Sequence, residues 1–148
     1  MKNFMEVVFL ADSVNESFAR VCVAGFVMRL NPSVEELGDI KTAVSEAVTN
    51  SVVHAYPNKK GYVKLRCEII EDQIKIIVLD DGVGIKDIEK AREPFYTTKP
   101  SEERSGMGFS VMESFMDKIE VLQNDVKGLK VVLYKTIKGK EKRLVSNA

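Results

Sequence analysis

The 148-residue sequence has no tryptophan, one histidine, two cysteines and four prolines. A single histidine excludes a metal site built mainly from histidines. The cysteines, Cys22 and Cys67, lie far apart and form no Cys-x-x-Cys spacing, and the first residues lack a basic segment followed by a long apolar run. These absences favour a protein of the cytoplasm, where thiols stay reduced.

The sequence also lacks net charge and long hydrophobic runs. Lysine plus arginine and aspartate plus glutamate number 22 each, which argues against binding nucleic acid or an acidic membrane through charge alone. No apolar run approaches the roughly 18 residues that a membrane-spanning helix needs. With 45% hydrophobic residues, the chain is long enough for one domain with its own core. We therefore expect a single domain over residues 1–148 that recognises its ligands through a shaped site.

The N-terminal part predicts a strand followed by a helix. Residues 3–10 alternate and are rich in Val, Phe and Met, which predicts a first strand at a sheet edge or a subunit contact. Ser13, with Glu16 three residues on, predicts the start of the helix. The apolar stripe expected on this helix consists of Val14, Phe18, Val21, Cys22, Gly25 and Phe26.

A second capping signature, Ser33 with Glu36, predicts a long helix that ends near Ala55. Glu46 and Asn50 are one turn apart on this helix and therefore share a face. The opposite face is apolar or small and comprises Leu37, Ile40, Val44, Val48, Ser51 and Ala55. On an isolated helix, Glu46 and Asn50 would be ordinary solvent-exposed residues, and only the motifs that follow make them a candidate site.

The rest of the chain predicts four strands, one loop and one helix. The strands are expected at about 62–70, 73–79, 118–123 and 129–137. Residues 86–105 predict a long loop of the kind that covers a site, a helix follows from Gly108, and the polar, basic tail at 138–148 is expected to fray. The order of elements predicts an α/β, two-layer sandwich: a mixed, mostly antiparallel sheet with helices on one face.

Two glycine motifs carry candidate chemistry. In Asp80-x-Gly82-x-Gly84, a strand ends in a carboxylate, which can accept a hydrogen bond from an amino group such as that of adenine. Gly106-x-Gly108 precedes a helix, where exposed amides at the positive end of the helix dipole can hold phosphates. Each motif alone is also compatible with a plain tight turn.

Taken together and in this order, the motifs resemble those of the GHKL ATPase superfamily, which includes gyrase, Hsp90, histidine kinases and MutL. The matching motifs are Glu46-x-x-x-Asn50, Asp80-x-Gly82-x-Gly84, Phe95-Tyr96-Thr97-Thr98-Lys99 and Gly106-x-Gly108. The resemblance covers nearly the whole chain and implies the Bergerat ATP-binding fold. A narrower resemblance, to sporulation anti-sigma factors that are serine kinases, rests on Ser17–Arg20, Ser45–Asn50, Thr97–Pro100 and Glu103–Phe109.

The resemblance implies ATP or ADP and Mg²⁺ as cofactors and assigns roles to individual residues. Asn50 would hold the magnesium ion, Glu46 would act as general base, and Asp80 would bind the adenine amino group. Gly82 and Gly84 would let the base approach. The phosphate cradle would comprise Gly106, Met107 and Gly108, and the loop would be ordered by Thr97, Thr98 and Lys99. We add Arg104 as a candidate for charge stabilisation, because a guanidinium suits phosphate oxygens.

The sequence departs from the superfamily at one position on the adenine side. Many members place a Gly-Thr near the last strand, with the threonine joining the hydrogen bonds around the base. Here the stretch reads Lys127-Gly128-Leu129-Lys130, so no threonine is available. Adenine recognition is therefore expected to depend more on Asp80 and water.

The resemblance implies a homodimeric anti-sigma factor that binds a sigma factor and phosphorylates a serine on its anti-anti-sigma antagonist. Glu16 and Arg20, one turn apart, are expected to be off the apolar stripe and to form part of the partner-binding surface, although an ordinary surface pair is equally compatible with their spacing. Two other functions remain open: a nucleotide-dependent binding module without phosphotransfer, and a stand-alone ATPase or histidine-kinase-like domain. Glu46 favours chemistry over the first, and the absence of a histidine-bearing hairpin disfavours an autokinase.

Overall fold

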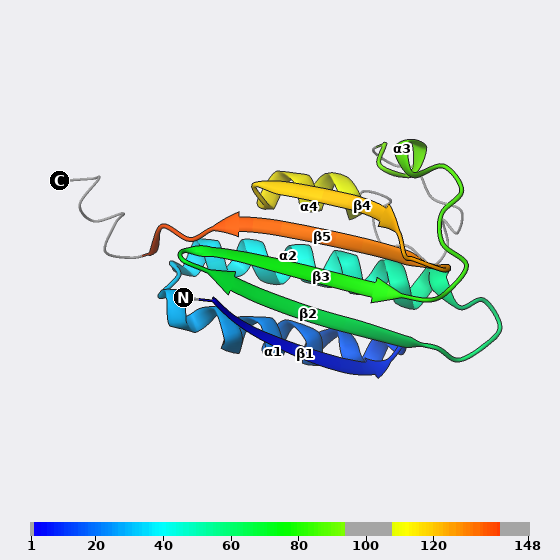
Figure 1. Ribbon diagram of the computed structural model, residues 1–148, viewed down its shortest axis with the longest axis horizontal. Coiled ribbons are helices and arrows are strands. Elements are labelled where there is room, and N and C mark those ends of the chain that lie inside the picture. Colours follow the sequence, from blue (N-terminus) through cyan, green and yellow to red (C-terminus); the bar gives the residue numbers. More distant parts are fainter. Residues whose placement is uncertain (1, 94–107, 140–148) are drawn as a thin grey trace.

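The computed structural model describes residues 2–93 and 108–139 (Figure 1). The strands are β1 (Lys2–Leu10), β2 (Tyr62–Ile70), β3 (Gln73–Asp80), β4 (Lys118–Gln123) and β5 (Leu129–Thr136). The α-helices are α1 (Glu16–Val27), α2 (Val34–Asn50), α3 (Ile88–Ala91) and α4 (Gly108–Phe115). Short 3₁₀ turns, η1 (Ser13–Asn15) and η2 (Met28–Leu30), flank α1, and a π-helical turn, η3 (Ser51–Ala55), continues α2.

The described strands form one sheet in the order β1-β2-β3-β5-β4. All four pairings are antiparallel, so the expected mixed sheet is wrong in that detail for the described strands. The reason is that β4 lies at the outer edge and returns through a tight turn, which makes β5 antiparallel to both β4 and β3. The expected edge position of the first strand is confirmed, because β1 pairs with β2 alone.

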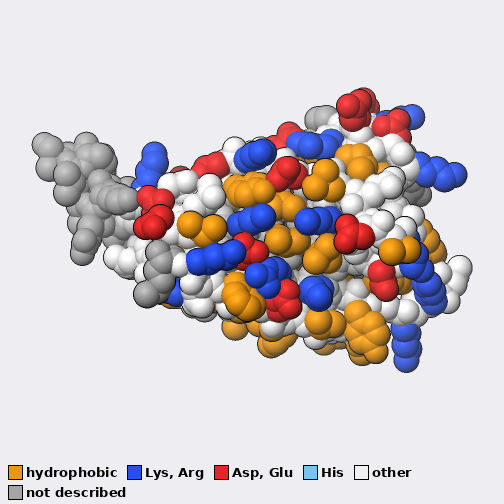
Figure 2. All heavy atoms as spheres, viewed as in Figure 1, with side chains coloured by type: hydrophobic (Ala, Val, Ile, Leu, Met, Phe, Trp, Pro, Cys, Tyr) orange, Lys and Arg blue, Asp and Glu red, His pale blue; other side chains and the backbone are white. Residues whose placement is uncertain are grey.

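The sheet and the helices form two layers, as the alternating strand patterns predict. Helices α1, α2 and α4 lie behind the sheet in Figure 1, and α2 packs against both of the others. The strand residues that face the helices are buried, as Leu65, Ile76 and Leu133 are. The opposite face has no helix among the described residues, and Figure 2 shows Lys and Arg side chains interspersed with apolar ones across it.

The capping box predicted for α2 is confirmed and has a further role. Ser33 Oγ accepts from the Glu36 amide at 3.1 Å, and the Glu36 carboxylate accepts from the Ser33 amide at 2.9 Å. The same carboxylate accepts from the amides of Lys138 at 2.7 Å and Gly139 at 3.0 Å. The expected fraying is therefore wrong for residues 138–139, which Glu36 holds. The rest of the tail lies outside the described residues.

The expected apolar stripe on α1 is wrong for most of its members, and of the six only Cys22 and Phe26 pack against the core, both partly buried. The cap of the first turn is Asp12, whose carboxylate accepts from the Val14 amide, and not Ser13. The buried residues are Glu16, Ala19, Val23 and Val27, whereas Val14, Phe18 and Val21 are exposed. This helix is apolar on more than one side, and the side of Ala19, Val23 and Val27 faces inward, where α1 packs against α2.

The described part of the expected loop contains a short helix. Asp87 caps α3 by accepting from the Lys90 amide at 3.1 Å. Just beyond α3, the guanidinium of Arg92 pairs with the carboxylate of Glu113 on α4. Ion pairing and capping thus stabilise a helix that the apolar pattern did not predict. In the described chain, no helix is long and apolar enough to cross a membrane.

Candidate functional site

The carboxylate of Asp80, at the end of β3, is the centre of a buried hydrogen-bond network. Its side chain faces the helices, and the residue is 4% exposed. Oδ1 accepts from the amides of Gly82 and Leu129, both at 3.1 Å. Oδ2 accepts from the hydroxyl of Ser51 at 2.9 Å. A carboxylate has about four acceptor positions, so one position on Oδ2 is left for a ligand donor.

Close backbone approaches explain the glycines around Asp80. A Cβ on Gly82 would lie 2.1 Å from the carbonyl oxygen of Ala55, at the end of η3. Gly128 has a φ of +95°, and a Cβ there would lie 2.1 Å from the carbonyl oxygen of Asp80. The Val83 amide also donates to Ala55 O at 2.9 Å. The turn after β3 is therefore clamped between η3 and the start of β5.

Ser51 is a site residue whose role the sequence did not reveal. The α-helical pattern of α2 ends at Asn50, and the π-helical turn that follows has Ser51 on its buried side, 3% exposed. Such π-turns within helices are frequent at functional sites. The sequence places Ser51 on the apolar face of the predicted helix, where a hydroxyl needs a buried hydrogen-bond partner. That requirement was the signal that could have identified Ser51 as a site residue.

Glu46 and Asn50 lie on the side of α2 that faces the start of α4. Both are half-buried. A Cβ on Gly108 would lie 3.3 Å from both terminal atoms of the Asn50 side chain and 3.4 Å from Glu46 Oε2. The structure thus brings three predicted site residues, Glu46, Asn50 and Gly108, into one place. With glycine at 108, the start of α4 places no side chain between its backbone and the ends of Glu46 and Asn50.

Tyr56 fixes the residue next to Asp80. Its hydroxyl donates to the Asp81 carboxylate at 2.6 Å and accepts from the Asp81 amide at 3.0 Å. Burial, with the hydrogen bond to Asp81, raises the pKa of Tyr56 to about 12, and that hydrogen bond lowers the pKa of Asp81. Tyr56 therefore remains a neutral donor at physiological pH. It is a second supporting residue that the sequence analysis missed.

The arrangement suits a magnesium ion held by few protein atoms. The described residues contain no group of three His, Cys, Asp or Glu side chains that could hold a metal ion by themselves. Asn50 nevertheless offers a carboxamide oxygen at the place where Glu46 and Gly108 come together. Mg²⁺ is typically held by one or two such oxygens together with waters and substrate phosphates. The residues present therefore fit a magnesium–nucleotide complex.

Several predicted site residues lie outside the described part of the chain. They are Thr97, Thr98, Lys99, Arg104, Gly106 and Met107. Their assigned roles stay predictions.

The expected surface pair on α1 is wrong for Glu16. Glu16 is 7% exposed, because its side chain lies at the contact of α1 with α2. There its Oε1 accepts from Thr49 Oγ1 at 2.9 Å. Arg20 is half-buried and donates to Ser45 Oγ at 3.1 Å. Both side chains thus contact α2. Only Arg20 keeps surface for a partner.

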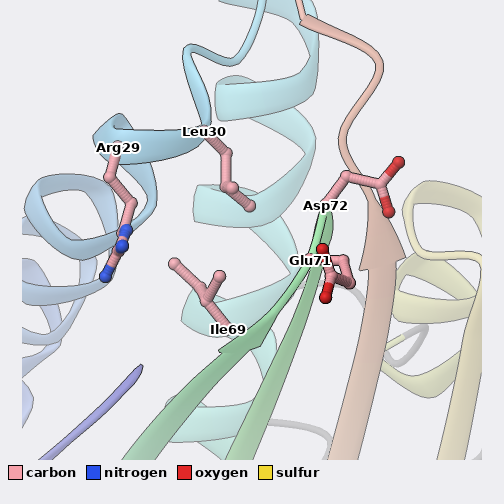
Figure 3. Close-up of a pocket in the computed structure, with 5 residues that line it drawn as sticks. All are labelled: Arg29, Leu30, Ile69, Glu71 and Asp72. Carbon is pink, nitrogen blue, oxygen red and sulfur yellow. The ribbon is translucent and has the colours of Figure 1, made fainter. Parts of the chain in front are cut away.

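A pocket of about 420 Å³ lies away from these residues (Figure 3). It is lined by Arg29, Leu30, Ile69, Glu71 and Asp72. Glu71 and Asp72 form the turn between β2 and β3, at the opposite end of β3 from Asp80. The pocket is therefore separate from the candidate site.

Comparison with known proteins agrees with this geometry. A family model described as "Histidine kinase-like ATPase domain" matches residues 10–135. The anti-sigma F factor of Clostridium novyi (strain NT) is 52% identical over 140 residues, which cover 94% of this chain and 98% of that protein. The anti-sigma F factor of Clostridium acetobutylicum is 56% identical over 136 residues, covering 91% and 94%.

Solved structures show the same fold at low sequence identity. The RsbU and RsbW domains of a Mycobacterium tuberculosis protein match with a TM-score of 0.66 at 16% identity, over 91% of this chain and 32% of that longer chain. The catalytic domain of the histidine kinase ThkA matches with a TM-score of 0.57 at 19% identity, covering 91% and 98%. Both likenesses confirm the α/β fold.

Proposed function

We infer the function of this chain from its family, because it belongs to the histidine kinase-like ATPase domain family and, within it, to the anti-sigma F factors. We propose that it binds a sigma factor and that it is an ATP-dependent protein serine kinase. Its substrate would be a serine on the anti-anti-sigma antagonist.

The juxtaposition of Glu46, Asn50 and Gly108 is the observation that carries the proposed phosphotransfer. Glu46 Oε2 lies close to Gly108 at the start of α4. The helix that carries Glu46 continues into η3, where the Ser51 hydroxyl donates to Asp80. Adenine bound at Asp80 and phosphates near Gly108 would therefore be held by successive parts of one helix. That arrangement supports a single nucleotide site.

In the proposed reaction, Glu46 accepts the proton of the antagonist's serine hydroxyl as that oxygen attacks the γ-phosphorus of ATP. The bond between the γ-phosphorus and the bridging oxygen breaks, and ADP leaves. Magnesium would supply charge neutralisation of the phosphates, with Asn50 as its protein ligand. Arg104 and the loop residues Thr97, Thr98 and Lys99 are proposed to assist.

The Glu46→Gln variant separates a kinase from a nucleotide-dependent binding module. The substitution preserves size and removes the base, so ATP affinity and sigma-factor binding should persist. Transfer of labelled phosphate to the antagonist should fall by about 10²- to 10⁴-fold, the usual contribution of a positioned general base. Glu120→Gln, on the open face of the sheet, is the matched control.

Wild-type transfer by Glu46→Gln would exclude Glu46 as the base. The absence of transfer in the parent protein, with ATP and sigma factor both bound, would instead favour the binding module. Rapid ATP hydrolysis without transfer to the antagonist would favour a stand-alone ATPase.

We also propose that the protein is a homodimer that uses β1. This strand leaves its outer edge unpaired among the described residues, and Phe4 and Val8 on it are 55% and 58% exposed. An apolar edge strand of this kind is typically covered in a functional assembly. Sedimentation at micromolar concentration should therefore give the mass of a dimer. A stable monomer would contradict the proposal.

A further inference from the structure

We propose that the hydroxyl of Ser51 orients Asp80 for the adenine base. It would do so in place of the threonine hydroxyl that many superfamily members supply after the glycine near the last strand, here Gly128. This inference rests on the proposed ATP binding. It concerns Ser51 as a positioning residue, because its hydrogen bond in the structure is to Asp80.

The positions of the donors around Asp80 support this substitution of one hydroxyl for another. Leu129 follows Gly128, where the threonine would be, and its side chain and that of Asp80 are both buried on the helix-facing side of neighbouring strands. The Leu129 amide still donates to Oδ1, but the leucine side chain has no polar atom. Ser51 approaches from α2 and donates to Oδ2 instead.

The hydroxyl of Ser51 donates to a different kind of acceptor from the hydroxyls of two other helical serines in this chain. The hydroxyls of Ser45 and Ser114 donate to carbonyl oxygens one turn back, those of Lys41 and Ser110, both at 2.9 Å. Ser51 instead bonds across the core to a residue 29 positions away in the chain. The hydroxyl therefore links the helix that presents Asn50 to the carboxylate expected to bind the base.

The remaining acceptor position on Asp80 determines which nucleotides should depend on the Ser51 hydroxyl for their affinity. Gly82 and Leu129 occupy Oδ1, and Ser51 occupies one side of Oδ2. The free side of Oδ2 can accept a hydrogen bond from the 6-amino group of adenine, whereas guanine presents an oxygen acceptor there. Removing the Ser51 hydroxyl should therefore weaken the binding only of nucleotides that carry the 6-amino group.

The experiment compares ATP with purine riboside triphosphate, which lacks the 6-amino group, by calorimetric titration of the full chain with magnesium. Ser51→Ala should raise the Kd for ATP about tenfold, the lower range for a hydrogen bond to a charged group. The Kd for the analogue should change less than about twofold. Ser114→Ala is the matched control, and it should alter neither affinity.

Introducing a threonine at position 129, as many superfamily members have, should rescue ATP binding in the Ser51→Ala variant. Adding Leu129→Thr to Ser51→Ala should bring the Kd for ATP back to within about threefold of the parent, because cross-strand neighbours on one face are close enough for a new hydroxyl to reach Asp80. Ser51→Thr and Ser51→Val form a second pair of equal volume. The threonine variant should bind ATP more tightly than the valine variant.

Equal weakening of ATP and the analogue by Ser51→Ala would overturn the inference, since it would mark a purely structural residue. Equal ATP affinities for Ser51→Thr and Ser51→Val would also overturn it. These outcomes leave the proposed kinase intact, because they compare variants of a protein that binds ATP. Failure of the parent to bind ATP would instead refute the proposed function itself.

Discussion

Asp80→Asn tests whether the buried carboxylate reads the base. Oδ1 of Asp80 accepts from two amides and Oδ2 from the Ser51 hydroxyl. An asparagine can keep its oxygen on the two amides, which places its NH₂ group at the Oδ2 position. Ser51 can then accept rather than donate. The fold should therefore survive, with a loss of about 1–2 kcal/mol in the free energy of unfolding.

The effect on nucleotide binding should be larger than the effect on stability. The adenine amino group loses a hydrogen bond to a charged acceptor, which costs about 1.5–3 kcal/mol. It also faces the NH₂ group of the new asparagine, which is itself a donor and is left without an acceptor, at a cost of about 1–3 kcal/mol. A combined loss of about 3 kcal/mol corresponds to roughly a 150-fold increase in the Kd of ATP and ADP alike. GTP should lose less, because its O6 can accept from the new NH₂ group.

Calorimetric titration of ATP, ADP and GTP measures these changes directly. Asp39→Asn is the matched control, because Asp39 is on α2 and its carboxylate lies 3.7 Å from Lys135 Nζ, outside the site. If Asp80→Asn is folded and binds ATP with parental affinity and selectivity, the carboxylate merely caps the turn after β3. Adenine recognition must then lie elsewhere.

Three further substitutions test the fold and the partner surface. Burial alone raises the pKa of Glu36, but hydrogen bonds from the Ser33, Lys138 and Gly139 amides lower it overall. Its stabilising effect should therefore be complete above the unfolded pKa of about 4.3 and lost as pH falls through the lower folded pKa. In urea unfolding, Glu36→Gln should lower the free energy of unfolding at pH 7 and reduce the further loss of stability as the pH falls into the acid range. An unchanged loss of stability at acid pH would contradict this role of Glu36. Gly128→Ala should cost at least about 2 kcal/mol in thermal unfolding, because φ is +95° and the Cβ would collide with Asp80 O; the control Gly38→Ala, with open space at its Cβ, should be neutral or stabilising. Arg20→Glu should weaken capture of the sigma factor or the antagonist while ATP affinity is kept, and normal capture of both would exclude Arg20 from the partner surface.

Local sequence signals determined most of the elements and the centre of the site. Ser33 and Glu36 start α2 through a capping box, which involves only neighbours in the chain. The alternation in 62–70 and 73–79 predicts strands because a period of two places one face in the core. The spacing of Glu46 and Asn50, and the glycines after Asp80, are likewise local. Helix, strand and turn geometry predicted where these residues lie, and the resemblance of the ordered motifs to the superfamily marked them as one site.

Tertiary structure decided which of several possible faces and partners were used. The helix α1 has apolar residues on more than one side, and contact with α2 selected the side of Ala19 and Val23, which buried Glu16 as well. Glu36 holds residues 138–139 across 102 and 103 positions of sequence, and Ser51 reaches Asp80 across 29. Such pairings depend on how the elements pack, because a single side chain has many polar groups within its possible reach. The sequence alone specifies the groups, and the packed core specifies which of them meet.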